Sequence, residues 1–270
     1  MTMRYIQRGL VYAGLSLAAF LSVFPFIWLM VGATNTSADI LKGKASLGNA
    51  LVLNFTHLRE QVDLPTLFWN STKIAIIATV LTLIVSSMAG YGFEMFRNKV
   101  SERIFASLLA VLSIPFAALM IPLFVTMAQL HIINTHTAVI LPTVASIFII
   151  FYFRQATKSF PLELRDAARV DGLKEWQIFL HIYVPVMRST YAAATIIVFM
   201  ANWNAYLWPL IVLQTNETKT LTLAVASLLT AYTPDFGVTM VATTLATLPT
   251  LFIFFVLQKQ FVQGLLGSVK

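Results

Sequence analysis

The feature that most restricts this sequence is a series of long stretches without a charged residue. No charged side chain occurs between Arg8 and Asp39, and five further stretches of the same character follow along the chain. A helix that crosses the hydrocarbon layer of a bilayer needs about 20 mostly apolar residues. The sequence therefore predicts six membrane-spanning helices, over residues 10–32, 74–93, 104–128, 137–153, 190–213 and 238–257.

The composition supports this interpretation. Hydrophobic residues make up 58% of the 270 residues and charged residues only 11%, whereas soluble domains average about 25% charged residues. The chain contains no cysteine, which excludes a disulfide scaffold. Unbroken apolar runs are also unlike the alternating pattern of a β-barrel. We expect an all-α membrane protein with one transmembrane domain over residues 1–270.

The basic residues predict the orientation of the chain. With the N-terminus inside, the inner segments hold thirteen Lys and Arg residues and the outer segments hold five. Because basic residues collect in cytoplasmic loops, both termini are predicted to be cytoplasmic. The same bias accounts for the net charge of +7, so no nucleic-acid partner is expected. Membrane lipid is expected to surround the spans.

The sequence offers little support for catalysis. It has no G-x-x-x-x-G-K-[ST] loop, no G-x-S-x-G elbow and no H-E-x-x-H helix, and its four histidines are scattered. We therefore predict no catalytic residue, no metal and no cofactor in this chain. No span carries an ionisable group near its centre, although ion-coupled transporters place such groups there. This favours a pathway-forming subunit driven from elsewhere, while a secondary active transporter and a membrane-embedded enzyme remain the alternatives.

Charge is concentrated in the inner loop over residues 154–188. Pro161 suits the first position of a short helix, and Gly172 suits a left-handed stop. A second short helix is expected from about Lys174 until Pro185 ends it. Trp176, Phe179, Leu180 and Tyr183 would form its apolar stripe. On spacing alone, an amphipathic hairpin that only anchors the neighbouring spans is an equally good explanation.

The same loop closely resembles the signature loop of ABC importer permeases, which has the form E-A-A-x3-G followed by an apolar-x-x-P ending. Ala167, Ala168, Gly172 and Pro185 match this form, and Asp166 stands where the family usually has Glu. Span five, with Trp203-Asn-x-Tyr-x-Trp-Pro-Leu, and the C-terminal segment ending at Lys270 resemble the carbohydrate branch, in particular the MalG-type subunit. The resemblance covers essentially the whole chain and implies the type I ABC importer permease fold.

The resemblance implies a set of partners and a role for the loop. A MalF-type second permease, a MalK-type ATPase dimer that uses ATP and Mg, and a periplasmic or extracellular sugar-binding protein would complete a sugar importer. The loop would dock on the ATPase, with Asp166 as an ion-pair partner and Gly172 as the bend. The outer loop 214–237 resembles one that contacts the binding protein, and the C-terminal tail resembles one that reaches the ATPase dimer. The implied coupling residues are Leu164, Asp166, Ala167, Ala168, Asp171, Gly172, Trp176, Phe179 and Pro185. Because other permeases share the loop, a non-sugar solute remains an alternative.

Span five carries aromatic and amide side chains that suit an uncharged sugar. A sugar presents apolar patches ringed by hydroxyl groups, and unpaired amides are costly in lipid. The candidate residues of a substrate path are Asn202, Trp203, Asn204, Tyr206 and Trp208. A plain alternative is that the rings form an aromatic belt at the outer interface while the amides bond to neighbouring helices. Pro209 is expected to bend the span.

Overall fold

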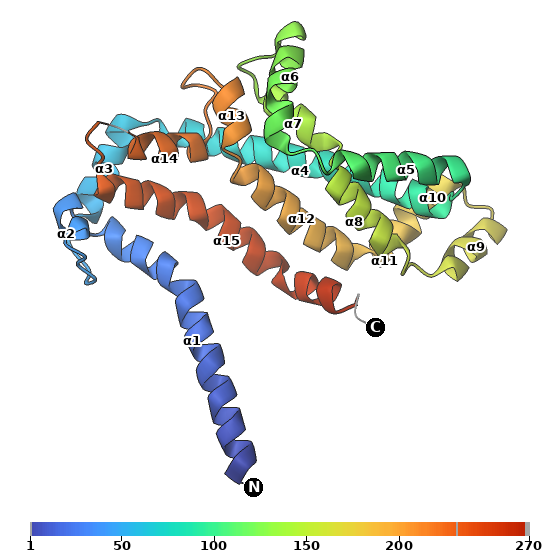
Figure 1. Cartoon of the computed structure of the whole chain (residues 1–270), viewed down its shortest axis with the longest axis horizontal. Helices are drawn as coiled ribbons and strands as arrows, with labels where there is room; N and C mark the ends of the chain where they lie inside the picture. The colour runs from blue at the N-terminus through green and yellow to red at the C-terminus, as the bar shows by residue number, and fades with distance from the viewer. Residues whose placement is uncertain (1, 231, 268–270) are drawn as a thin grey trace. The chain divides into compact units, whose positions relative to one another are not determined.

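The computed structural model describes residues 2–230 and 232–267, and every regular element within them is helical (Figure 1). The chain forms two compact units. One consists of Met1–Leu64 with Ala224–Leu248, and the other of Pro65–Leu223 with Pro249–Lys270. The first unit contains α1 (Thr2–Ala33), α2 (Ser37–Leu41) and α3 (Leu51–Gln61). The boundaries between the units fall at α4 (Leu64–Met95), α14 (Leu221–Leu229) and α15 (Phe236–Gly267).

The second unit holds the remaining helices. They are α5 (Lys99–Val111), α6 (Phe116–Gln129), α7 (His136–Val144), α8 (Ile147–Thr157), α9 (Leu162–Val170), α10 (Glu175–Ile178), the π-helix η1 (Phe179–Tyr183), α11 (Val184–Val186), α12 (Arg188–Trp203) and α13 (Leu207–Val212).

The predicted spans are confirmed as helical segments, with changes in their bounds and shape. Within the described residues, five segments are long and apolar enough to cross a membrane: Gln7–Ala33, Leu64–Met95, His136–Thr157, Arg188–Val212 and Phe236–Lys259. The sixth is a broken pair, α5 and α6, bent by 101°. The sequence predicted one helix over 104–128, but the helix stops at Val111 and restarts after Pro115, which caps α6. A proline has no N–H for the helical ladder, so the chain turns there.

Close packing of α4 against its neighbours depends on small side chains. Ala75, Ala78, Ser86 and Gly90 are buried along this helix. At Gly90 a Cβ atom would lie 2.6 Å from Cβ of Phe153 and 2.8 Å from the backbone nitrogen of Arg154. Small residues allow membrane helices to approach each other in this way. The second unit is therefore built around a long helix in direct backbone contact with α8.

The first unit has its own core, formed by Ala33, Leu58 and Val238 with their apolar neighbours. The buried amide of Asn54 donates to the carbonyl oxygens of Ala33 and Asn35, both at 2.9 Å. These carbonyls lie at the end of α1, where the helix supplies no partner of its own. A polar side chain thus closes the end of the first span, and this unit contains none of the predicted site residues.

Candidate functional site

The hairpin, defined here as residues 161–187, forms the first region of the candidate site. Its first helix confirms the sequence prediction: α9 follows Pro161, which is its N-cap, and the chain reverses at Gly172 with φ of +82°. An L side chain rarely adopts this left-handed conformation, so glycine suits the reversal. The two arms of the hairpin therefore turn back on each other where the sequence predicted the bend.

The second arm differs from the prediction. Pro185 does not end the helix, because the helical turns run on from α10 through η1 into α11. The N–H of Val184 donates to the carbonyl of Phe179, five residues earlier. This wider turn stands directly before the proline, whose ring would otherwise meet the carbonyl of the preceding turn.

The predicted apolar stripe is divided between two faces of the second arm. Tyr183 is buried and Phe179 is half-buried, whereas Trp176 and Leu180 are exposed. The Tyr183 hydroxyl lies 2.6 Å from Oγ1 of Thr157 on α8, and burial raises the pKa of this phenol. The inward side chains attach the second arm to α8, and the exposed indole of Trp176 is left for another surface.

Glu175 connects the two arms of the hairpin to the end of α4. Its carboxylate accepts hydrogen bonds from Nη2 of Arg165 at 3.2 Å, Nε of Arg169 at 2.6 Å and the hydroxyl of Tyr91 at 3.2 Å. Arg165 is 8% exposed, and its Nη1 lies 3.5 Å from the carbonyl oxygen of Met95. Partial burial raises the pKa of Glu175, but the hydrogen bond from Arg169 and the charge of Arg165 outweigh it, so this pKa lies below its ordinary value. We call these groups the Glu175 cluster.

A second group of charges stands beside the same end of α4. Arg154 on α8 is buried; its Nε donates to Glu94 at 3.2 Å, and its Nη2 donates to Glu102 on α5. Arg97 donates to Glu102 at 2.8 Å. The guanidinium carbon of Arg154 lies 4.0 Å from the centre of the Phe105 ring. Ion pairs thus tie α4, α5 and α8 together next to the hairpin.

The implied coupling residues lie on different sides of the hairpin. Ala168 is buried within this chain, whereas Ala167 is exposed on the turn beside it. Other residues of the set are also exposed: Leu164, Asp166, Asp171, Gly172, Trp176 and Pro185. Val170, which belongs to no motif recognised in the sequence, is 87% exposed. The exposed face therefore offers small and apolar side chains with two carboxylates.

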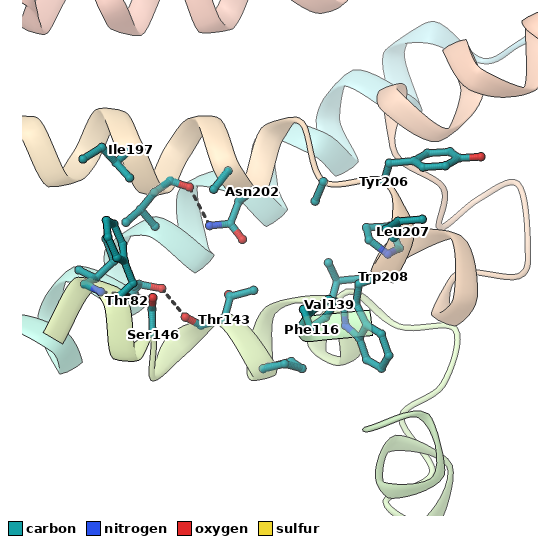
Figure 2. Close-up of a pocket in the computed structure, with 17 residues that line it drawn as sticks. Thr82, Phe116, Val139, Thr143, Ser146, Ile197, Asn202, Tyr206, Leu207 and Trp208 are labelled. Carbon is teal, nitrogen blue, oxygen red and sulfur yellow. Dashed lines mark hydrogen bonds between the residues drawn. The ribbon is translucent and has the colours of Figure 1, made fainter. Parts of the chain in front are cut away.

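The second region of the candidate site is a pocket of about 590 Å³ where α12 gives way to α13 (Figure 2). The helix breaks over residues 204–206, before Pro209 and not at it. Tyr206, Leu207 and Trp208 line one end of the pocket, and Asn202 lines it from the last turn of α12. Further lining residues from α4, α7 and α8 include Thr82, Val139, Thr143, Ser146 and Ile149. None of the lining residues is ionisable except the phenol of Tyr206.

The polar groups of the pocket stabilise irregular backbone. Pro142 has no N–H, so it leaves the carbonyl of Ala138 without its usual partner four residues later. The indole Nε1 of Trp208, 5% exposed, donates to that carbonyl at 2.9 Å. Thr82 donates to the carbonyl of Thr143 at 3.0 Å, near the end of α7. Both bonds give a hydrogen-bond donor to a backbone carbonyl that is away from water and would otherwise be unpaired.

Three of the five predicted path residues line this pocket, and two do not. Asn202 donates to its own Val198 carbonyl at 2.8 Å, and Figure 2 shows its amide oxygen on the side of the cavity. Trp203 is instead buried, with its ring 5.8 Å from that of Phe199. Asn204 is exposed and donates to the Met200 carbonyl at 3.0 Å. Neighbours in sequence point in different directions around a helix, so the stretch could not contribute as a block.

The predicted outer loop 214–237 contains an ordered first part. Asn134, with φ of +60°, accepts hydrogen bonds at its side-chain oxygen from the backbone nitrogens of Gln214 and Thr215 and from the Thr218 hydroxyl. Asn70 donates to the carbonyls of Glu217 and Lys219. Asn134 was not selected from the sequence, because a lone asparagine in a short loop is a common turn residue. Residue 231 of the loop and residues 268–270 of the predicted tail lie outside the described residues.

Comparison with known proteins places these features in context. Residues 82–267 match the family described as "Binding-protein-dependent transport system inner membrane component". The chain is 65% identical over 259 residues to the lactose transport system permease protein LacG of Rhizobium radiobacter, covering 96% of this chain and 95% of the relative. It is 37% identical over 271 residues to the arabinooligosaccharides transport system permease protein AraQ of Halalkalibacterium halodurans, covering 98% and 97%.

A solved structure shares the fold. A chain of a bacterial ABC transporter involved in the import of the acidic polysaccharide alginate superposes with a TM-score of 0.80, covering 94% of this chain and 96% of that one. The sequence identity is 21%, so this likeness concerns the fold alone.

Proposed function

The chain belongs to the family of binding-protein-dependent transport system inner membrane components, and from this premise we propose that it is a membrane subunit of an ATP-driven sugar importer. The observation that carries the proposal is the 65% identity to a lactose transport permease along nearly the whole of both chains. Lactose is an uncharged disaccharide, and the pocket lining is uncharged at neutral pH. A lactose-like disaccharide is therefore the first substrate to test.

The hairpin is the part of this subunit that the ATPase would bind and move. The proposed mechanism assigns ATP and Mg to a separate ATPase dimer, which binds the exposed face around Asp166, Ala167 and Trp176. A change in the ATPase would then reach α4 through the Glu175 cluster, because this carboxylate of the second arm accepts hydrogen bonds from two arginines of the first arm and from Tyr91 of α4. This chain supplies no nucleotide chemistry of its own in the proposal.

The remaining parts of the assembly follow from the same family. A second permease would complete the pathway, and an extracytoplasmic sugar-binding protein would deliver the solute to the side of the ordered loop at Asn134. The excess of basic residues in the inner segments supports cytoplasmic termini in a bacterial inner membrane. In this arrangement the hairpin and the two charge groups near the end of α4 face the cytoplasm.

The proposal is tested by measuring uptake of labelled lactose in cells that make the transporter with this chain or its variants. Ala167→Trp places a bulky ring on the exposed face without disturbing the buried side of α9, so we expect loss of both uptake and sugar-stimulated ATPase activity. Ser159→Trp is the matched control, since it adds the same ring at an exposed small residue outside α9. Uptake that continues after ATP depletion, or full activity of Ala167→Trp, would contradict the proposal.

A further inference from the structure

A second hollow in the same unit has a different character from the α12–α13 pocket. It is a groove of about 480 Å³ between α4 and α7, and none of its lining residues belongs to the pocket described above. One end carries Lys73, His136 and Thr137, and the rest is apolar. The apolar lining is formed by Ile77, Leu81, Ile140, Leu141 and Val144.

The polar end of this groove lies where a membrane boundary is expected. Residues 74–93 contain no charged side chain and are bounded by Lys73 and Glu94. Twenty helical residues are about 30 Å long, which matches the hydrocarbon layer. On the neighbouring span, residues 137–153 are likewise free of charge and follow directly after His136. Lys73 and His136 therefore stand together at the level of the phospholipid headgroups.

The apolar side chains continue the groove from that level into the hydrocarbon. Ile77 and Leu81 lie one and two turns beyond Lys73 on α4, at the spacing that keeps side chains on one face. Ile140 and Val144 follow His136 on α7 with the same spacing. Ile77, Leu81 and Leu141 are exposed. The groove thus has a cationic end and an apolar course along the two helices.

The cationic end has no counter-charge within the described residues. Lys73 forms no ion pair or hydrogen bond there. His136 donates from Nε2 to the carbonyl of Thr218 at 3.1 Å, which holds its ring in place. The carboxylate of Glu217 is close in sequence to Thr218, and hydrogen bonds from its own backbone amide and the Thr215 hydroxyl lower its pKa, but it forms no ion pair with Lys73. The half-buried ammonium group of Lys73 is therefore available to an anion.

We propose that this groove binds one anionic phospholipid, with its phosphate at the ammonium group of Lys73 and an acyl chain along Ile77, Leu81, Ile140 and Val144. Charge complementarity selects the headgroup: the end of the groove offers a cation and no carboxylate, so a zwitterionic headgroup would leave its ammonium unpaired. Free phosphate alone would leave the apolar part of the groove unfilled. Basic pockets between membrane helices bind anionic headgroups on the cytoplasmic side, and the proposal places the same chemistry at the outer end of α4.

The proposal is tested on the purified transporter complex in neutral detergent by native mass spectrometry with added phosphatidylglycerol or phosphatidylcholine. We expect one tightly bound phosphatidylglycerol and no matching phosphatidylcholine. Lys73→Gln should weaken phosphatidylglycerol binding about fivefold, the effect of one basic residue near a membrane surface. Lys99→Gln, an exposed lysine at the start of α5, is the matched control and should change neither lipid. Inorganic phosphate should not compete.

Two further variants examine the apolar course. Ile77→Trp fills the groove and should reduce phosphatidylglycerol binding while lactose-stimulated ATPase activity in detergent persists. Because the chain contains no cysteine, Leu141→Cys can be labelled alone in the membrane with a lipid-soluble maleimide, and we expect it to react. Equal binding of both lipids, no effect of Lys73→Gln, or a Leu141→Cys thiol protected by a neighbouring subunit would overturn the proposal.

Discussion

The hairpin and the α12–α13 pocket satisfy their polar groups by opposite means. In the hairpin, two arginines and a tyrosine converge on the carboxylate of Glu175. In the pocket, an indole and a threonine donate to carbonyls that a proline and a helix end have left free. Full charges are tolerated where water can still reach part of the cluster, whereas an apolar surrounding favours neutral partners.

The hairpin is suited to transmitting a movement, and the α12–α13 pocket is suited to the passage of a solute. A cluster of charges holds separate helices in one arrangement, which suits a part that must pass on a movement. An uncharged pocket can accept a hydroxyl-rich solute without having to displace a strongly bound ion. Five predictions examine this difference, from the largest expected effect to the smallest.

The largest effect is expected when a charge is placed at the pocket. Thr82 is 1% exposed, so Thr82→Asp would bury a carboxylate against the carbonyl of Thr143 and lower the free energy of unfolding by about 3–5 kcal/mol. Thr82→Ser keeps the hydroxyl and should change little. Thermal unfolding in detergent compares the two variants. Equal stability would show that the pocket tolerates charge as the hairpin does.

Removal of the charge at the hairpin should have a smaller effect on folding and a large one on coupling. Glu175→Gln leaves the buried guanidinium of Arg165 without its anion, at about 2 kcal/mol, between the values for exposed and buried pairs. We expect sugar-stimulated ATPase activity and uptake to fall together. Glu163→Gln, on the exposed start of α9, is the control. Uptake that stays tightly coupled in Glu175→Gln would refute the role of the cluster.

The pH dependence of the same cluster has a definite sign. Its surroundings hold the pKa of Glu175 below the ordinary value of 4.5. The ionised form is therefore favoured in the folded chain, and the stability that it contributes is complete at neutral pH and is lost as the pH falls below 4.5. Glu175→Gln should lose this part of the acid dependence when unfolding is followed between neutral and acidic pH.

A neutral hydrogen bond in the pocket can be removed and then replaced. Trp208→Phe keeps an aromatic ring but leaves the Ala138 carbonyl unpaired, and should cost about 1–2 kcal/mol of stability. Adding Pro142→Ala supplies a backbone N–H four residues after Ala138, so the double variant should recover most of the loss. Thermal unfolding of the two single variants and the double variant gives the coupling energy. Independent effects would contradict this pairing.

The smallest effect concerns the solute itself. Asn202→Ala removes an amide that lines the pocket, and one lost hydrogen bond of about 1 kcal/mol would raise the KM for lactose uptake roughly fivefold. Asn204→Ala is the matched control, because Asn204 is exposed and bonds only to its own helix. Equal KM values for the two variants would mean that the pocket is not on the sugar path.

Local sequence was sufficient for the features that depend on one segment. The charge-free runs predicted the spans, and Gly172 predicted the reversal of the hairpin, because a bilayer crossing and a left-handed turn each impose a local requirement. The proline at 185 was misinterpreted as a stop, since the π turn that accommodates it is not visible as a residue pattern. The break at 204–206 was expected at Pro209 for the same reason: a proline signals irregularity without giving its position.

Contacts between distant segments required the tertiary structure. No spacing rule brings Tyr91 to Glu175, or sets Trp208 opposite a carbonyl freed by Pro142, because each pairing joins segments far apart in the chain. The sequence by itself determined that this is a membrane protein with up to six spans, and it determined where the hairpin turns. Only the packing of the helices decided which polar groups meet, because lipid leaves each buried donor and acceptor to find its partner within the protein.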